Sequence, residues 1–256
     1  MDNRPIPQDE WMARNSLRFF KRLEAPLLIS QTVGLSNEGV LRILRDHFEI
    51  VSRDAYYISI VAREILSDKV SDKIYQEEEV LKAEQEVFKT FEHANAYFNT
   101  RIKQAEQILG ESGGMDLGIK PGTVKLFEAW CTTRTATKWL ELLKKADHYL
   151  TLNYHLWVLG ELVPANATEG EALAAKLNNE RGARGELANL RRSLAHQFAT
   201  IRNLVNRVTA QRETELEVRR REQSERDRVL KGRAPRRKAK TGAASDTSAV
   251  STLETA

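Results

Sequence analysis

The sequence predicts a mainly α-helical protein with one short β-strand in each chain. Of its 256 residues, 41% are hydrophobic and 30% are charged, which is enough apolar material for a buried core. Only six prolines interrupt the chain, so long stretches are free to form helices. In several of these stretches, apolar residues recur every three or four positions, a spacing typical of amphipathic helices.

The first half of the chain is predicted to be an arm followed by helices. Residues 1–35 lack helical spacing and are expected to form an N-terminal arm. The residues from Ser36 to Gly39 are typical of a helix start, and residues 36–110 are predicted to be a helical region. Within this region, residues 53–66 fit a helix or a strand. The apolar residues from Val80 to Leu109 keep one helical face over about eight turns.

The strand is predicted in a second region, residues 111–231, which begins with a glycine-rich loop. Five of the 13 glycines lie between positions 110 and 122. The residues after this loop alternate as in a strand from 123 to 130. One predicted face, expected to form a dimer core, carries Val124, Leu126 and Trp130. The other face, expected to point outward, carries Thr123, Lys125 and Phe127. A lone strand leaves backbone groups unpaired, so it must find a partner.

The rest of this region is predicted to be helical, followed by a charged tail. One amphipathic helix is expected from Thr135, and a second, long one contains residues 187–208 and continues as charged helix to 231. Residues 232–256 are expected to form a disordered basic tail. Residues 211–240 hold 12 Lys and Arg against 6 Asp and Glu, whereas residues 1–210 hold 28 of each kind. Such a basic run suits a polyanion, although it also fits a solubilising tail.

The sequence contains none of the residue patterns that identify common enzymes. No two of the five histidines have the spacing that places two metal ligands on one helix face. Phosphate-binding loops and nucleophile elbows are also absent, and the lone Cys131 fits a buried structural thiol. We therefore expect no enzyme activity, no cofactor, no metal and no small-molecule substrate. Without a long apolar run or a secretory signal near the first residue, we expect a cytoplasmic protein without a membrane partner.

Three stretches of the chain resemble the AcaB-like family of conjugative plasmids and integrative conjugative elements. They are Pro121–Trp130, Trp139–Tyr149 and Leu190–Arg207. The resemblance covers residues 85–210 and implies a transcriptional regulator of conjugative-transfer genes with a ribbon–helix–helix relationship. The connection at 160–170 is longer than a compact unit of that kind needs.

The leading interpretation is therefore a homodimer that binds double-stranded DNA and activates transcription. The same strand from two chains would pair into a two-stranded ribbon, which fits the major groove and reads base edges there. The candidate DNA-contacting residues are Thr123, Lys125, Phe127, Arg134, Lys138, Arg233, Arg236, Arg237 and Lys238. In the structural alternative, residues 123–130 form an edge strand or an irregular link covered by their own helices. The alternative function is a helical interaction or scaffold protein of a conjugative element, with non-specific nucleic-acid affinity through its basic tail. An RNA-binding adaptor is a third possibility, although no single-strand stacking motif is evident.

Overall fold

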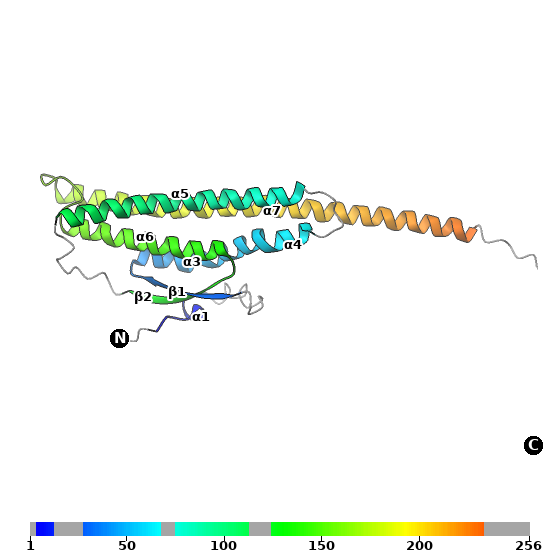
Figure 1. Cartoon of the computed structure of the whole chain (residues 1–256), viewed down its shortest axis with the longest axis horizontal. Coiled ribbons are helices and arrows are strands. Elements are labelled where there is room, and N and C mark those ends of the chain that lie inside the picture. The colour runs from blue at the N-terminus through cyan, green and yellow to red at the C-terminus, as the bar shows by residue number, and fades with distance from the viewer. Residues whose placement is uncertain (1–3, 13–27, 68–74, 113–123, 233–256) are drawn as a thin grey trace, which may run out of the picture. The chain divides into compact units, whose positions relative to one another are not determined.

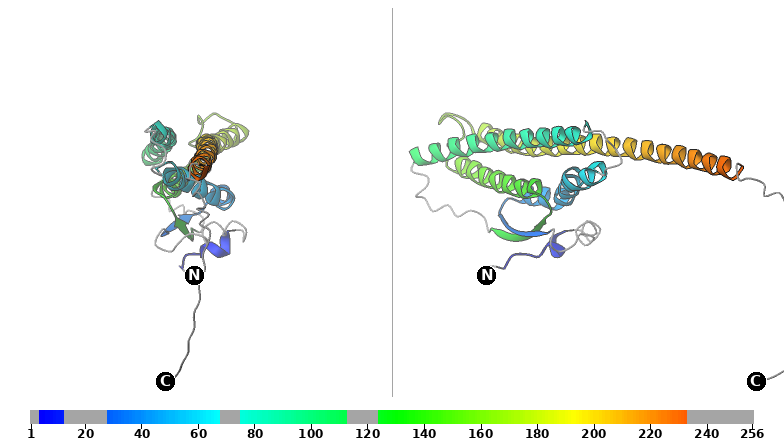
Figure 2. Two further views of the ribbon diagram at one scale, coloured as in Figure 1. Left: turned by 90° about the vertical axis from the view of Figure 1, so that its right-hand side faces the viewer. Right: turned by 45° about the vertical axis from the view of Figure 1, so that its right-hand side comes forward.

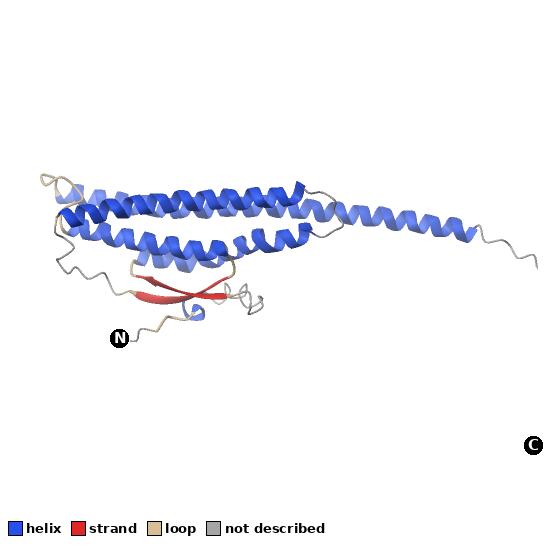
Figure 3. Cartoon of the chain, in the orientation of Figure 1, coloured by secondary structure: helices blue, strands red, loops and turns tan. Residues whose placement is uncertain are grey.

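A computed structural model describes most of the chain. The described residues are 4–12, 28–67, 75–112 and 124–232. Contacts divide the chain into two compact units, Met1–Val208 and Thr209–Ala256. The described part of the first unit is mainly helical and contains a two-stranded antiparallel sheet, which Figure 3 shows in red.

The elements follow one another in the order α1, β1, α3, a π-helical turn, α4, α5, β2, α6 and α7. Their bounds are Gln8–Trp11 (α1), Ile29–Leu35 (β1), Glu38–Tyr56 (α3), Tyr57–Val61 (the π-turn), Ala62–Ser67 (α4), Tyr75–Glu111 (α5), Lys125–Cys131 (β2), Arg134–Val158 (α6) and Glu169–Gly232 (α7). The predicted helices are confirmed, and the ambiguous residues 53–66 are helical throughout.

Side-chain caps fix where two of the helices begin. The Asn37 side-chain oxygen Oδ1 accepts hydrogen bonds from the backbone N–H groups of Gly39 and Val40, at 2.9 and 3.3 Å, and so starts α3. The Thr133 hydroxyl accepts from the N–H of Ala136 at 3.2 Å and starts α6. Beyond the C-terminus of α6, Gly160 has a φ of 78°, the left-handed conformation in which glycine commonly ends a helix.

Within the first unit, α6 is the central helix. It packs against α3, α5 and both strands. Figures 1 and 2 show the sheet on one side of α3 and α6, with α5 on the other side. One hydrophobic core joins these layers, and α7 contributes residues up to Val208 to it. Its fully buried large side chains include Phe48, Phe98, Phe127, Trp139, Leu190 and Ile201.

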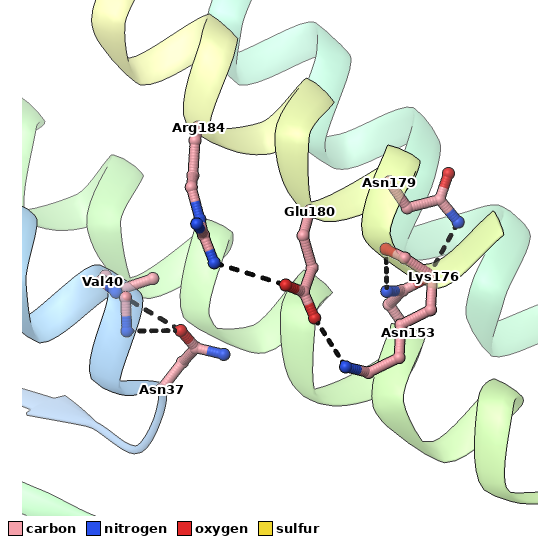
Figure 4. A network of polar contacts seen from close by, with 8 residues as sticks. Asn37, Val40, Asn153, Lys176, Asn179, Glu180 and Arg184 are labelled. Carbon is pink, nitrogen blue, oxygen red and sulfur yellow. Dashed lines mark hydrogen bonds and ion pairs between the residues drawn. The ribbon is translucent and has the colours of Figure 1, made fainter. Parts of the chain in front are cut away.

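A polar network attaches the first part of α7 to α6 (Figure 4). Asn153 of α6 is 1% exposed; its amide donates to the Lys176 carbonyl at 3.3 Å and its oxygen accepts from Asn179 at 2.8 Å. On α7, Glu180 pairs with Lys176 at 2.9 Å and with Arg184 at 3.3 Å. The buried amide is therefore satisfied, as buried polar groups must be to avoid a large desolvation cost.

The predicted strand is not alone in its chain. It pairs antiparallel with β1, which lies in the stretch expected to be an N-terminal arm, and Thr32 faces Glu128 at the centre of the register. The other edge of β2 pairs with Ile6 through two backbone hydrogen bonds of 2.8 Å. The Ile6 N–H donates to the Leu126 carbonyl, and the Glu128 N–H donates to the Ile6 carbonyl. The expectation of one strand per chain is therefore wrong, and with it the reason for pairing with a second chain.

The two faces of β2 are the reverse of the prediction. Phe127, expected to point outward to DNA, is 0% exposed, whereas Val124, expected in a dimer core, is 50% exposed. Both faces of the strand carry large apolar side chains, so alternation alone could not tell which face is buried. The Phe127 ring contacts the Trp11 ring edge-on at a centroid distance of 6.1 Å, and Trp11 also contacts Phe48 of α3. Leu126 and Trp130 lie half-buried on the opposite face.

Candidate nucleic-acid interface

The sheet and two of the helices form two matched strand–turn–helix units. The first is β1 with α3 and the second is β2 with α6. Both strands have seven residues, and each is followed after one intervening residue by a helix N-cap, Asn37 or Thr133. Since the strands pair about the Thr32–Glu128 centre, the units hold equivalent positions around that point. A two-stranded ribbon, expected from two chains, is thus formed within one chain.

Each turn of this ribbon is held by the helix of the other unit. After β1, the backbone N–H groups of Ser36 and Asn37 donate to the Asp147 carboxylate of α6 at 3.0 and 2.6 Å. The Ser36 hydroxyl donates to the same carboxylate at 2.9 Å. After β2, the Thr132 hydroxyl donates to the Ser52 carbonyl of α3 at 3.5 Å. Asp147 is 7% exposed, so its bonds are shielded from water and strengthened by the low local dielectric.

The outer face of the ribbon is polar at its centre and apolar at one end. The side chains of alternate residues point to this face: Ser30 and Thr32 from β1, and Leu126, Glu128 and Trp130 from β2. Glu128 accepts hydrogen bonds from the Ser30 hydroxyl at 2.8 Å and from the Trp130 indole N–H at 3.4 Å. Glu128 is the charged group among these five residues, so the centre of the ribbon is acidic.

Gly34 leaves room for apolar side chains at one end of this outer face. A Cβ on Gly34 would lie 3.0 Å from Val124 Cγ1 and 3.2 Å from Leu126 Cδ2. The two apolar side chains therefore lie over the glycine, and a larger residue would make them shift by a few tenths of an ångström. Lys125, directly opposite Leu35 at the same end, is exposed as predicted. It shares the strand parity of Phe127 but lies at the end of β2, where the helices no longer cover it.

The other predicted contact residues do not gather on the ribbon. Arg134 and Lys138 lie in the first two turns of α6, where they line a cavity shared with α5. Thr123, Arg233, Arg236, Arg237 and Lys238 lie outside the described residues. Four further residues of the ribbon and its turns were not predicted from the sequence: Ser30, Thr32, Glu128 and Asp147. The signal that could have found them is the matched spacing of strand and cap around Asn37 and Thr133.

Among the residues that the structure describes, no three His, Cys, Asp or Glu side chains are grouped closely enough to hold a metal ion. In the same residues, no helix combines the length and the apolar character needed to cross a bilayer.

Comparisons with known proteins give a distant structural relationship. Neither a family model nor a curated protein matches the chain. Among solved structures, it is similar to the crystal structure of selenomethionine-containing AcaB from uropathogenic E. coli. The two share 14% sequence identity with a TM-score of 0.57, over 73% of this chain and 86% of that one. At this identity the likeness concerns the fold alone, and the chain therefore has a fold distantly related to that of AcaB.

Proposed function

We propose that this protein is a sequence-specific, DNA-binding transcriptional regulator that activates conjugative-transfer genes. The observation that carries the proposal is the pair of matched units, β1 with α3 and β2 with α6, which places a complete two-stranded ribbon on one chain. A ribbon of this kind fits the major groove of B-form DNA, where base edges are distinguishable. The fold relationship to AcaB, together with the sequence resemblance to its family, supports the regulatory role.

The chemistry of the outer face suggests how bases are read. The hydroxyls of Ser30 and Thr32 can donate to or accept from either kind of base edge. Glu128 at the centre can accept a hydrogen bond from a cytosine N4 amino group, which is the usual partner of a carboxylate in the major groove. Lys125 has the strand parity of the buried face, but it is exposed at the end of the ribbon, and from there it can donate to a phosphate or to guanine O6 and N7. The proposed ribbon therefore reads a cytosine-containing centre, with a basic contact beside it.

Each chain carries its own ribbon in this proposal. A homodimer, if formed, would place two complete ribbons on two half-sites instead of sharing one ribbon between two chains. The dimer surface would then lie elsewhere than on β2, because both edges of β2 are already paired with β1 and Ile6.

A scaffold or interaction protein with non-specific nucleic-acid affinity is the second candidate. The observation that favours it is the acidic Glu128 at the centre of the outer face, which repels phosphates. Under this alternative the exposed apolar Val124 marks a protein-binding surface. Sequence specificity separates the two candidates, because a charged tail binds all duplexes alike and loses affinity steeply with salt.

Genome-wide mapping of bound DNA, followed by fluorescence anisotropy on the recovered duplex, tests the proposal. A regulator prefers that duplex over a shuffled one by about 1,000-fold or more near physiological salt. Glu128→Gln and Lys125→Ala should each weaken specific binding by about five- to 150-fold and change the preferred base at one position. Lys103→Ala, an exposed lysine on α5, serves as the control. Equal affinity for recovered and shuffled duplexes would instead favour the scaffold.

A further inference from the structure

A cavity lies at the start of α6, and residues of the turn between β2 and α6 line it. Its volume is about 450 Å³. Its walls come from the π-turn, α4, α5 and the first turns of α6, together with Leu194 from the middle of α7. Small-molecule sites commonly measure about 300–1,000 Å³. The apolar wall consists of Ile58, Ile60, Val87, Phe88, Phe91 and Leu194. Phe88 is 41% exposed, so this wall includes an aromatic ring that a ligand can reach.

One end of the cavity is positively charged. Arg134 and Lys138 are one helical turn apart on α6, and both line the cavity. The Lys138 ammonium lies 3.5 Å from the centre of the Phe88 ring. Within the described part of the chain, no carboxylate forms an ion pair with either cation. Burial, and then the nearby Arg134, lower the pKa of Lys138, while Glu92 and Glu141 act in the opposite direction.

The start of α6 adds backbone donors to this end. The first N–H groups of a helix have no acceptor within the helix, and the helix dipole favours an anion there. Thr133 accepts from the N–H of Ala136, and the N–H groups of Arg134 and Thr135 in the same turn have no acceptor within the helix. The acid in the lining, Glu84, is already paired with Arg63 at 2.5 Å, so it does not neutralise the two cations of α6.

Two further observations distinguish the cavity from an ordinary packing gap. The π-turn at Tyr57–Val61 contributes Ile58, Ser59 and Ile60 to the wall, and single π-turns inside α-helices are frequent at functional sites. In addition, the Nε atom of Arg63 has no hydrogen-bond partner among the described residues, although the Nη2 atom of the same side chain pairs with Glu84. The Arg63 side chain is 40% exposed, so this Nε is a further donor beside the lining of the cavity.

We propose that this cavity binds a small amphipathic monocarboxylate, an apolar or aromatic body that carries one carboxylate. The carboxylate takes the end formed by Arg134, Lys138 and the first turn of α6, and the body packs against Phe88, Phe91 and Val87. An apolar wall with one cationic end suits this class better than a phosphate, which needs polar donors on several sides. Binding at this cavity is independent of DNA binding by the ribbon.

Isothermal titration of the full chain with matched probes tests the proposal. The carboxylates are octanoate and 4-phenylbutyrate, their neutral counterparts are 1-octanol and 4-phenylbutanol, and inorganic phosphate represents a purely polar anion. We expect saturable binding of at least one carboxylate, with the matched alcohol about tenfold weaker or more and phosphate without effect. Equal binding of carboxylate and alcohol, binding of phosphate alone, or no binding of either carboxylate at millimolar concentration would overturn the proposal.

Three variants locate the binding. Lys138→Met keeps a chain that can pack on Phe88 but removes the charge, and it should weaken the carboxylate about tenfold while sparing the alcohol. Ser59→Phe fills the cavity and should abolish binding of both probes. Lys144→Met, at an exposed position of the same helix, is the matched control and should bind like the wild type. Unchanged carboxylate affinity in folded Lys138→Met, or in folded Ser59→Phe, contradicts the proposed site.

Discussion

Replacing Asp147 with alanine should destabilise the protein far more than an ordinary helix substitution. The carboxylate accepts from the Ser36 N–H, the Asn37 N–H and the Ser36 hydroxyl at 2.6–3.0 Å, and it is 7% exposed. Without it, two partly buried backbone donors at the start of α3 lose their acceptor. Each unsatisfied buried donor costs about 1–3 kcal/mol, so two of them lower the free energy of unfolding by about 2–6 kcal/mol.

Urea denaturation followed by circular dichroism measures this loss. Glu141→Ala removes an exposed carboxylate from the same helix and should change the free energy of unfolding by no more than about 0.5 kcal/mol. Asp147→Asn keeps one acceptor oxygen but turns a donor toward the N–H groups, so it should fall between the two. A loss below about 1 kcal/mol for Asp147→Ala would refute the claim that this carboxylate holds the turn after β1.

Three further outcomes follow from the burial of particular side chains. Phe127→Ala should lower the free energy of unfolding by about 3–5 kcal/mol, and Leu126→Ala, at a half-buried position, should lower it clearly less. Equal losses in chemical denaturation would contradict the burial of Phe127 on the inner face of β2. Burial raises the pKa of Cys131 to about 11, so a thiol reagent such as dithionitrobenzoate at pH 8 should label Cys131 only when the chain unfolds locally. Rapid labelling of the native protein would contradict the burial of this thiol. Burial, and then the adjacent Arg191, lower the pKa of His47, so the unfolded chain binds more protons below pH ~6.5 and stability should fall as the pH drops from there. His47→Gln should reduce that slope in a pH series of denaturation curves, and an unchanged slope would assign it to other groups.

The helices were predictable because their signal is local. Apolar spacing, the cap at Asn37 and the glycines after position 109 are all contained in short stretches of sequence. The π-turn at Tyr57–Val61 was not predictable, because it changes the hydrogen-bond register without changing the apolar pattern.

The first strand was missed because its existence depends on a partner far away in the sequence. Only Val33 and Leu35 of β1 are buried, and the rest of its residues are polar, small or exposed. Such a pattern is weak evidence for a strand until β2 supplies the backbone partners. The same dependence hid Asp147, which in sequence is one more acid on a charged helix face and in the fold is a buried acceptor.

The candidate DNA-contacting residues were predictable only where their position depends on local sequence. The exposure of Lys125 followed from its strand position, whereas the burial of Phe127 depended on how Trp11 and Phe48 pack against it. Arg134 and Lys138 were recognisable as cations at a helix start. Their position at a cavity, away from the outer face of the ribbon, is set by the packing of α5 against α6.

An engineered disulfide between β1 and β2 tests most directly whether the ribbon forms within one chain. Thr32 and Glu128 are directly opposed, and opposed residues in an antiparallel pair lie about 4.5–5.5 Å apart between Cα atoms, within reach of a disulfide. Thr32→Cys with Glu128→Cys, in a Cys131→Ala background, is oxidised and analysed by non-reducing gel and mass spectrometry. An intrachain ribbon gives an internal disulfide in a single chain of 29.2 kDa. A disulfide-linked species of twice that mass, formed in place of the internal bond, would contradict it.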